Sequence, residues 1–270
     1  IAVSMVAGPV GNSVAAVNRA NLFDIVSVRP ESGPAVGVAH PVVVTFAGPI
    51  ANRAAAERAI DIASVPAMTG RFEWLGSDVV QWVPDGFWPA HSTVALSVGG
   101  RPRTFATGPK VLGVASAADH TFTVTIDGIE SGPSSPLPAP HHRPRWGEPG
   151  VFPASMGRSK YPTPVGIYRV MAKERGIVMD SSTVGIPVNS PDGYHLKVDY
   201  AVRFTSRGLF VHDAPWAVNS LGSENVSHGC VSLSVEDAEW YFITVNVGDP
   251  IIVRENSLEV PSEPRMGFAY

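Results

Sequence analysis

The chain contains one cysteine, Cys230, among 270 residues. A single thiol cannot form an internal disulfide, so a disulfide-stapled scaffold is excluded. Runs of lysine or arginine are also missing, and the net charge is −4. Nothing in this charge pattern attracts a phosphate backbone, and we expect no nucleic acid partner. Long apolar runs are missing too, because the opening "IAVSMVAGPVG" is far shorter than the ~20 residues that cross a bilayer.

Charge is scarce throughout the chain, at 16% charged residues, whereas 26 glycines and 25 prolines are present. This composition favours short strands and turns over long surface helices, so we expect a mostly β protein. A chain of 270 residues also exceeds the size at which one hydrophobic core usually suffices. Two domains are therefore expected.

The first half of the sequence reads as a series of short strands separated by Pro, Gly, Asp and Ser clusters. The expected strands cover 22–30, 41–46, 72–76, 79–84, 93–98 and 103–107, with one brief helix at 52–60. Short strands at this spacing predict an immunoglobulin-like β-sandwich over residues 22–109. No cluster of His, Asp, Glu and Cys occurs there, so we interpret this domain as a spacer or positioning domain. Residues 1–21 are interpreted as a linker or a strand from a preceding segment.

A second domain is expected over residues 110–255. Its strands are predicted at 110–116, 120–127, 163–172, 194–205, 208–216 and 249–255. A helix should begin after Ser234, because Asp237 follows three positions later in a capping pattern. The proline-rich stretch 131–153 is interpreted as a long loop. Its histidines, His141 and His142, have no neighbouring Cys or acidic residue that would complete a metal site. Residues 256–270 are interpreted as a loose tail.

Cys230 stands in an unusual local context. A lone cysteine is most often a small buried hydrophobe, but this one follows Ser227, His228 and Gly229, residues that suit a polar turn. A glycine directly before the thiol allows close approach of a substrate backbone and lets successive amides point in one direction, as an oxyanion site requires. The pattern indicates a nucleophile.

A candidate base, His212, follows the apolar run "LFV", which predicts a buried strand that ends at this histidine. The 18 positions between His212 and Cys230 are enough for a loop to bring the chain back. An imidazole within hydrogen-bond reach activates a thiol by accepting its proton. A core histidine satisfied by a carbonyl is the alternative. His228 is too near Cys230 in sequence to be the obvious base, and we expect it to shape the turn and the pocket.

A zinc site built from His212, His228 and Cys230 is a further reading, since all three residue types bind zinc. The additional carboxylate or thiolate at a recurring spacing, which zinc sites usually recruit, is not found. We therefore expect neither a metal nor any other cofactor.

The order "FVHDAPW" followed by "SHGCVSLS" resembles the signature of the L,D-transpeptidase (YkuD-like) catalytic domain. The likeness extends upstream to "ASMGRSKYPTPVGIYRV" and "VMDSSTVGIPVNSPDGYHLKVDY" and covers roughly residues 110–255. Together with an immunoglobulin-like domain in front, the chain looks most like the mycobacterial branch, and within it like L,D-transpeptidase 5. The resemblance implies that this half folds as the mostly β YkuD-like sandwich, with a short helix after the cysteine.

The resemblance implies a reaction on peptidoglycan stem peptides. Cys230 would attack the carbonyl of the third residue, diaminopimelate, of a donor tetrapeptide and expel D-alanine. An amine on an acceptor stem would resolve the thioester and leave a 3→3 cross-link. His212 would move the protons, and the backbone carbonyl of Asp213 would orient its ring. The amides of Gly229 and Cys230, with His228, would form the oxyanion site.

The same resemblance assigns lid, pocket and border positions to Tyr194, Met179, Trp216 and Ser227. Met179 and Trp216, taken without the motif, read as core residues. The family is also acylated by β-lactams, carbapenems especially, so these are expected inhibitors.

Two residues depart from the family pattern. Ser232 stands where asparagine or arginine is usual, and a shorter hydroxyl would hold the substrate or the turn less firmly. Asp213 stands where a small neutral residue is common. We hypothesise that its carboxylate favours an imidazolium at His212 and a thiolate ion pair. With the loop at 131–153, these differences affect donor preference and rate.

Two other functions stay open on the sequence alone. An L,D-carboxypeptidase or endopeptidase would use the same Cys230 and His212 but resolve the thioester with water. A wall-associated spacer or binding protein would carry a disabled site. Because the chain starts at Ile1 rather than methionine, we expect a mature or trimmed form. Cross-linking takes place outside the cytoplasmic membrane, so we expect an exported protein of the periplasm or cell wall, with a membrane tether upstream of Ile1 as an option.

Overall fold

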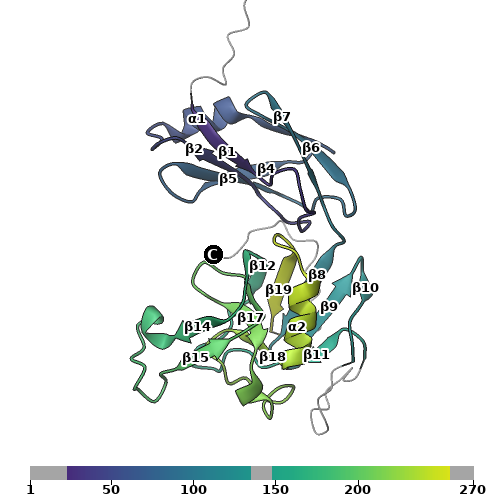
Figure 1. The fold of residues 1–270 in the computed structure, drawn as a ribbon, viewed down its shortest axis with the longest axis vertical. Coiled ribbons are helices and arrows are strands. Elements are labelled where there is room, and N and C mark those ends of the chain that lie inside the picture. Colours follow the sequence, from purple (N-terminus) through teal and green to yellow (C-terminus); the bar gives the residue numbers. More distant parts are fainter. Residues whose placement is uncertain (1–22, 135–147, 256–270) are drawn as a thin grey trace, which may run out of the picture.

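The computed structural model describes residues 23–134 and 148–255. Figure 1 shows two β domains stacked along the long axis of the molecule. The segments 1–22 and 256–270 lie outside the described residues, as do most of the proline-rich loop and the His141–His142 pair. Within the described residues, 23–134 and 148–255, no helix is long and apolar enough to span a membrane.

The first domain is a sandwich of two antiparallel sheets. One sheet has the order β1-β2-β5-β4 and the other β3-β6-β7. Its elements are β1 (Ile25–Arg29), β2 (Val42–Phe46), α1 (Arg53–Ile60), β3 (Ile62–Val65), β4 (Gly70–Trp74), β5 (Val79–Pro84), β6 (Thr93–Val98) and β7 (Arg101–Ala106). Alternating side chains of β6 are buried between the sheets, as the period of a strand requires. The expected immunoglobulin-like architecture is confirmed.

The second domain contains two larger sheets and a projecting hairpin. The sheets have the orders β10-β9-β8-β19-β12, with β11 paired to β9, and β13-β16-β17-β18. The strands before the hairpin are β8 (Val111–Ser116), β9 (Thr121–Ile126), β10 (Ile129–Glu130), β11 (Val151–Pro153), β12 (Gly166–Arg169) and β13 (Ala172–Glu174). The remaining elements are β14 (Ile177–Asp180), β15 (His195–Val198), β16 (Ala201–Arg203), β17 (Phe210–Asp213), β18 (Val231–Leu233), α2 (Val235–Thr244) and β19 (Pro250–Arg254).

One apolar core joins the two larger sheets and α2. Tyr168, Phe122 and Tyr241 are almost wholly buried in it, and each such side chain contributes roughly 1.5–3 kcal/mol on burial. The helix α2 begins where expected, because the hydroxyl of Ser234 accepts the backbone N–H of Asp237 at 3.1 Å. This cap fixes the helix directly after β18, which follows the cysteine.

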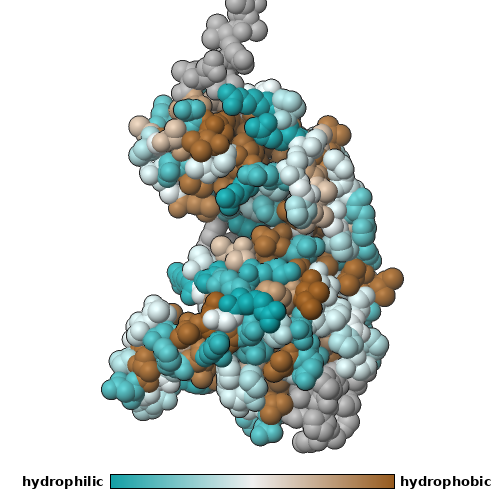
Figure 2. Space-filling view, in the orientation of Figure 1, coloured by the Kyte–Doolittle hydropathy of each residue, from teal (hydrophilic) through white to brown (hydrophobic). Residues whose placement is uncertain are grey.

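The β14–β15 hairpin pairs with neither larger sheet and projects from the second domain on the left of Figure 1. Val178 and Val184 are more than half exposed there, and Figure 2 shows hydrophobic patches on this projection. A two-stranded hairpin is marginally stable alone in water. Its position therefore depends on contacts made by its connecting segment.

The two domains meet at a tight backbone contact. The N–H groups of Gly37 and Ala39 donate to the carbonyls of Val247 and Gly248, each at 2.8 Å. Close approach is possible because Gly37 has no side chain: a Cβ there would lie 2.0 Å from the backbone nitrogen of Asp249. The seam therefore holds the first domain in a defined orientation on the second.

The substitution Gly37→Ala tests this seam. We expect the midpoint of urea unfolding to fall, with a loss of about 1–3 kcal/mol in the free energy of unfolding, as for other overpacked sites. Gly33→Ala is the matched control, because a Cβ at Gly33 meets nothing within 4 Å. Equal midpoints for the two variants would show that the seam adds nothing to stability.

Candidate active site

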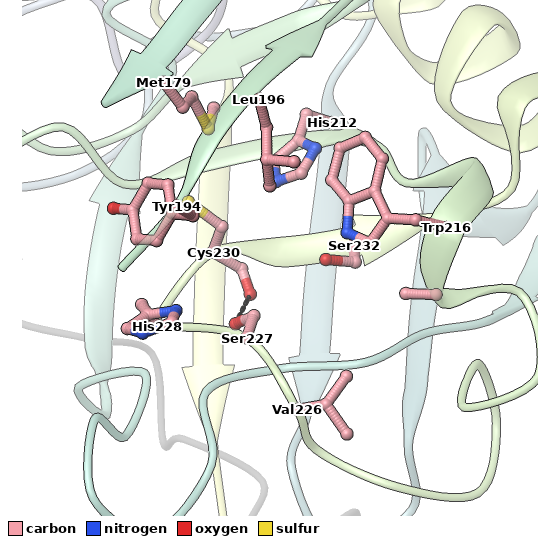
Figure 3. Close-up of a pocket in the computed structure, with 11 residues that line it drawn as sticks. Met179, Tyr194, Leu196, His212, Trp216, Val226, Ser227, His228, Cys230 and Ser232 are labelled. Carbon is pink, nitrogen blue, oxygen red and sulfur yellow. Dashed lines mark hydrogen bonds between the residues drawn. The ribbon is translucent and has the colours of Figure 1, made fainter. Parts of the chain in front are cut away.

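The parallel pairing of β17 with β18 builds the site. Its register places His212 opposite Ser232 and Asp213 opposite Leu233. Cys230 directly precedes β18. His212 and Cys230, 18 positions apart in sequence, therefore lie on or beside neighbouring strands. In Figure 3 the side chains of His212 and Cys230 face the same pocket. The expected return of the chain is therefore present.

The pocket has a volume of about 190 Å³. It gathers most of the residues predicted from sequence: Met179, Tyr194, His212, Trp216, Ser227, His228, Cys230 and Ser232. Leu196, Ala217 and Val226 complete the lining. Asp213 and Gly229 are not among the lining residues, and both act through the backbone.

The His212 imidazole is fixed by its neighbour. Its Nδ1 lies 2.5 Å from the backbone carbonyl oxygen of Asp213, and a carbonyl can only accept a hydrogen bond. The proton must therefore sit on Nδ1, which leaves the lone pair of Nε2 available. Burial lowers the pKa of His212 to about 4. His212 is thus a neutral imidazole whose Nε2 can accept a proton.

The Cys230 thiol is neutral as well. Burial raises its pKa to about 11, while the Phe210 backbone and the charge of Arg203 act in the opposite direction. Burial therefore disfavours both the thiolate of Cys230 and the imidazolium of His212 in the resting site. Use of this thiol as a nucleophile would require that its proton be removed.

The Asp213 carboxylate, which we hypothesised to favour an ion pair, is engaged with the backbone of a neighbouring turn. The Oδ1 of Asp213 accepts the backbone N–H of Asp199 at 2.7 Å, and burial raises the pKa of its carboxyl group. The carboxyl group of Asp213 therefore fixes the backbone of the turn between β15 and β16. Burial has the largest effect on the pKa of His212.

The turn before the cysteine is braced by Ser227. Its hydroxyl donates to the carbonyl of Cys230 at 2.7 Å and accepts the N–H of Gly229 at 3.0 Å. This corrects one expectation, because the amide of Gly229 is already engaged and is not free for an oxyanion. Gly229 has a φ of +117°, and a Cβ there would lie 3.0 Å from Leu209. Glycine is thus needed for conformation, not for its N–H group.

The rim of the pocket is aromatic. The His228 ring lies between the rings of Tyr161 and Tyr194, with centroid distances of 4.8 Å to each. Trp216 stacks beside His212 at 6.1 Å and is 49% exposed, so it is a rim residue and not a core residue. Met179 is half-buried and packs with Cys230 in a small apolar cluster.

Ser232 lies on the floor of the pocket. It is 4% exposed, and its backbone N–H donates to Ser155 while its carbonyl accepts from the same residue. The short hydroxyl therefore borders the space between His212 and Cys230 without filling it. Among the described residues, no three His, Cys, Asp or Glu side chains form a group that could hold a metal ion.

Three residues near the site were not singled out from the sequence, although the stretches that contain them carry the family resemblance. Thr163 donates to the carbonyl of Gly229 at 2.9 Å, and Arg158 contacts the His228 ring from a loop 70 positions away. Asp192, in the β14–β15 connection, binds Arg158. Long-range contacts of this kind leave no local periodicity.

The comparisons with known proteins agree with this geometry. Residues 140–253 match the family model of the L,D-transpeptidase catalytic domain, YkuD, and residues 11–99 match a bacterial Ig domain. Probable L,D-transpeptidase 3 of Mycobacterium tuberculosis is 66% identical over 94% of this chain and 95% of that protein. This chain belongs to the L,D-transpeptidase family.

Two solved structures are similar over the whole described fold. L,D-transpeptidase 3 from M. tuberculosis, in complex with a faropenem-derived adduct, has a TM-score of 0.80 and 66% identity, covering 86% of this chain and 99% of that one. LdtMt1 in complex with imipenem has a TM-score of 0.75 and 48% identity, covering 86% and 100%. The expected likeness to L,D-transpeptidase 5 is wrong, because that protein is only 29% identical, over 84% of this chain and 50% of that one.

Because burial raises the pKa of Cys230, we expect this thiol to titrate only at high pH. Thiolate absorbance near the ultraviolet edge should stay low at pH 7 and rise as the pH approaches the thiol pKa of about 11, because the protonated form persists below that value. Difference spectra against Cys230→Ala measure it. A Cys230-dependent thiolate signal already complete at pH 7 would mean that the ion pair is the resting state.

Proposed function

We propose that this protein is a peptidoglycan L,D-transpeptidase that works through a thioester on Cys230. The observation that carries the proposal is the pairing of β17 with β18. It sets a thiol and a correctly protonated imidazole at one pocket. The YkuD match and the L,D-transpeptidase relatives support the same reaction.

In the first half-reaction, Cys230 Sγ bonds to the carbonyl carbon of the third residue of the donor stem. The thiol proton passes to Nε2 of His212, which the Asp213 carbonyl keeps unprotonated. The bond to the terminal D-alanine then breaks, and its amine takes that proton from His212. The products are free D-alanine and a thioester.

In the second half-reaction, the side-chain amine of an acceptor diaminopimelate attacks the thioester carbonyl. His212 takes the proton of the amine and returns it to the departing sulfur, so the enzyme is regenerated. The backbone amide of Cys230 and the His228 ring donate hydrogen bonds to the negative oxygen of each tetrahedral intermediate. Gly229 is excluded from this role, because its N–H group is bound to Ser227.

Two hollows that meet at the thiol support a two-substrate reaction over hydrolysis. A second pocket of about 580 Å³ shares Met179, Tyr194, His228 and Cys230 with the first. A donor and an acceptor stem can then approach the sulfur from different sides. A carboxypeptidase needs room for one stem only, and a spacer protein needs neither pocket.

We further propose β-lactams as acylating inhibitors and an exported location. The relatives solved with a faropenem-derived adduct and with imipenem support the first, because a β-lactam carbonyl offers the same attack to Cys230. The location follows from the substrate, since stems are cross-linked outside the cytoplasmic membrane.

Incubation with a disaccharide-tetrapeptide, followed by mass spectrometry, tests the proposal. We expect a dimer that lacks one D-alanine, and no dimer with Cys230→Ala, because that variant has no nucleophile. Tripeptide without dimer would replace transpeptidation by carboxypeptidase activity. Unchanged substrate with the intact protein would contradict both reactions.

A further inference from the structure

His228 receives a hydrogen bond whose direction is fixed by chemistry. The Nη2 of Arg158 lies 2.8 Å from the Nε2 of His228. A guanidinium stays charged and has only donors, so Nε2 must accept. The proton of a neutral His228 therefore sits on Nδ1. Burial, followed by the charge of Arg158, lowers the pKa of His228, and this keeps the ring neutral.

Arg158 is in turn held by the β14–β15 connection. Its Nη2 lies 2.5 Å from Oδ1 of Asp192. The other oxygen of Asp192 binds Lys160 at 2.5 Å and accepts the hydroxyl of Tyr161 at 3.2 Å. The Nη2 group has two hydrogens, one for the carboxylate and one for the imidazole. The three side chains therefore form the chain Asp192–Arg158–His228.

The backbone places Arg158 beside the catalytic turn. Its N–H donates to the carbonyl of Ser227 at 3.0 Å, and Gly157 forms a bridge with the same residue. The loop is closely packed, since a Cβ at Gly157 would lie 2.1 Å from the carbonyl oxygen of Tyr161. Arg158 thus contacts His228 from a closely packed loop. Asp192 contacts Arg158 from the connection of the projecting β14–β15 hairpin.

We propose that Arg158 is a positioning residue that fixes His228 as a hydrogen-bond donor through Nδ1, and that Asp192, in the β14–β15 connection, holds Arg158 in place for this role. His228 cannot then act as a base at Nε2, and His212 alone has that role. The tautomer rests on geometry, whereas its catalytic use rests on the proposed function.

Nitrogen-15 NMR of the histidine-labelled protein tests the inference directly. Long-range proton–nitrogen spectra at pH 7 distinguish a protonated from an unprotonated ring nitrogen, and His228→Gln assigns the signals. We expect Nδ1 protonated and Nε2 unprotonated in the unmodified protein. Arg158→Met should shift the population toward Nε2–H, and Asp192→Asn should do so partly. An Nε2–H tautomer in the unmodified protein, or no change in Arg158→Met, would overturn the proposal.

Kinetics with conservative variants separates positioning from general damage. Arg158→Met should slow acylation of Cys230 by imipenem about 10- to 100-fold, the size of effect known for partners that orient metal-bound histidines. Arg158→Lys should restore the Nδ1–H tautomer and most of the rate, because an ammonium also only donates. Arg71→Met is the matched control, since Arg71 forms an ion pair with Glu73 at 2.8 Å in the first domain.

The two proposals fail in different ways. An Nδ1–H signal at His228 in a protein that forms no cross-linked dimer would leave this inference standing and remove the transpeptidase function. A dimer formed at an unchanged rate by Arg158→Met would remove the positioning role and leave the function. The spectrum of the unmodified protein is informative even if a variant does not fold.

Discussion

The parallel pairing of β17 with β18 is the constraint on which the rest of the site depends. It fixes His212 beside Ser232 and leaves Cys230 one residue before the strand. The carbonyl that orients His212 comes from the next residue of the same strand, Asp213. The helix capped by Ser234 follows immediately, and α2 packs on the catalytic core. A short piece of sheet therefore decides where the thiol, the base and the support for the turn lie.

The chemistry that follows from this placement is that of a neutral pair. Burial holds the proton on the thiol and off the imidazole, so the nucleophile is not preformed. A substrate carbonyl that develops negative charge in the pocket changes this balance, because it draws the proton toward His212 as the sulfur attacks. Such a thiol is protected from unrelated electrophiles, because the thiolate and not the thiol is the nucleophile. The aromatic rim, with His228 held by Arg158, limits which carbonyl can reach it.

Much of this could be predicted from sequence where the signal was local. The Ser234 cap, the polar turn at Cys230 and the strand that ends at His212 are patterns of adjacent residues, and they were placed correctly. The range 194–205 was predicted as one strand, but it breaks at Tyr200, which has a φ of +48°. The short strands β3, β10, β11, β13, β14 and β18 were not predicted, and β11 lies in the stretch that was interpreted as a loop. In β3, four residues before a proline leave little alternation. The engaged amide of Gly229 and the Asp192–Arg158–His228 contact depend on tertiary structure and had no local signal.

The central claim is that Cys230 attacks a carbonyl with His212 as its base. Intact-protein mass spectrometry after incubation with imipenem tests it most directly, with His212→Ala and Cys230→Ala beside the unmodified chain. The account predicts a single adduct on the peptide that contains Cys230, none with Cys230→Ala and a much slower one with His212→Ala. An adduct on another residue, or the same rate without His212, would contradict it.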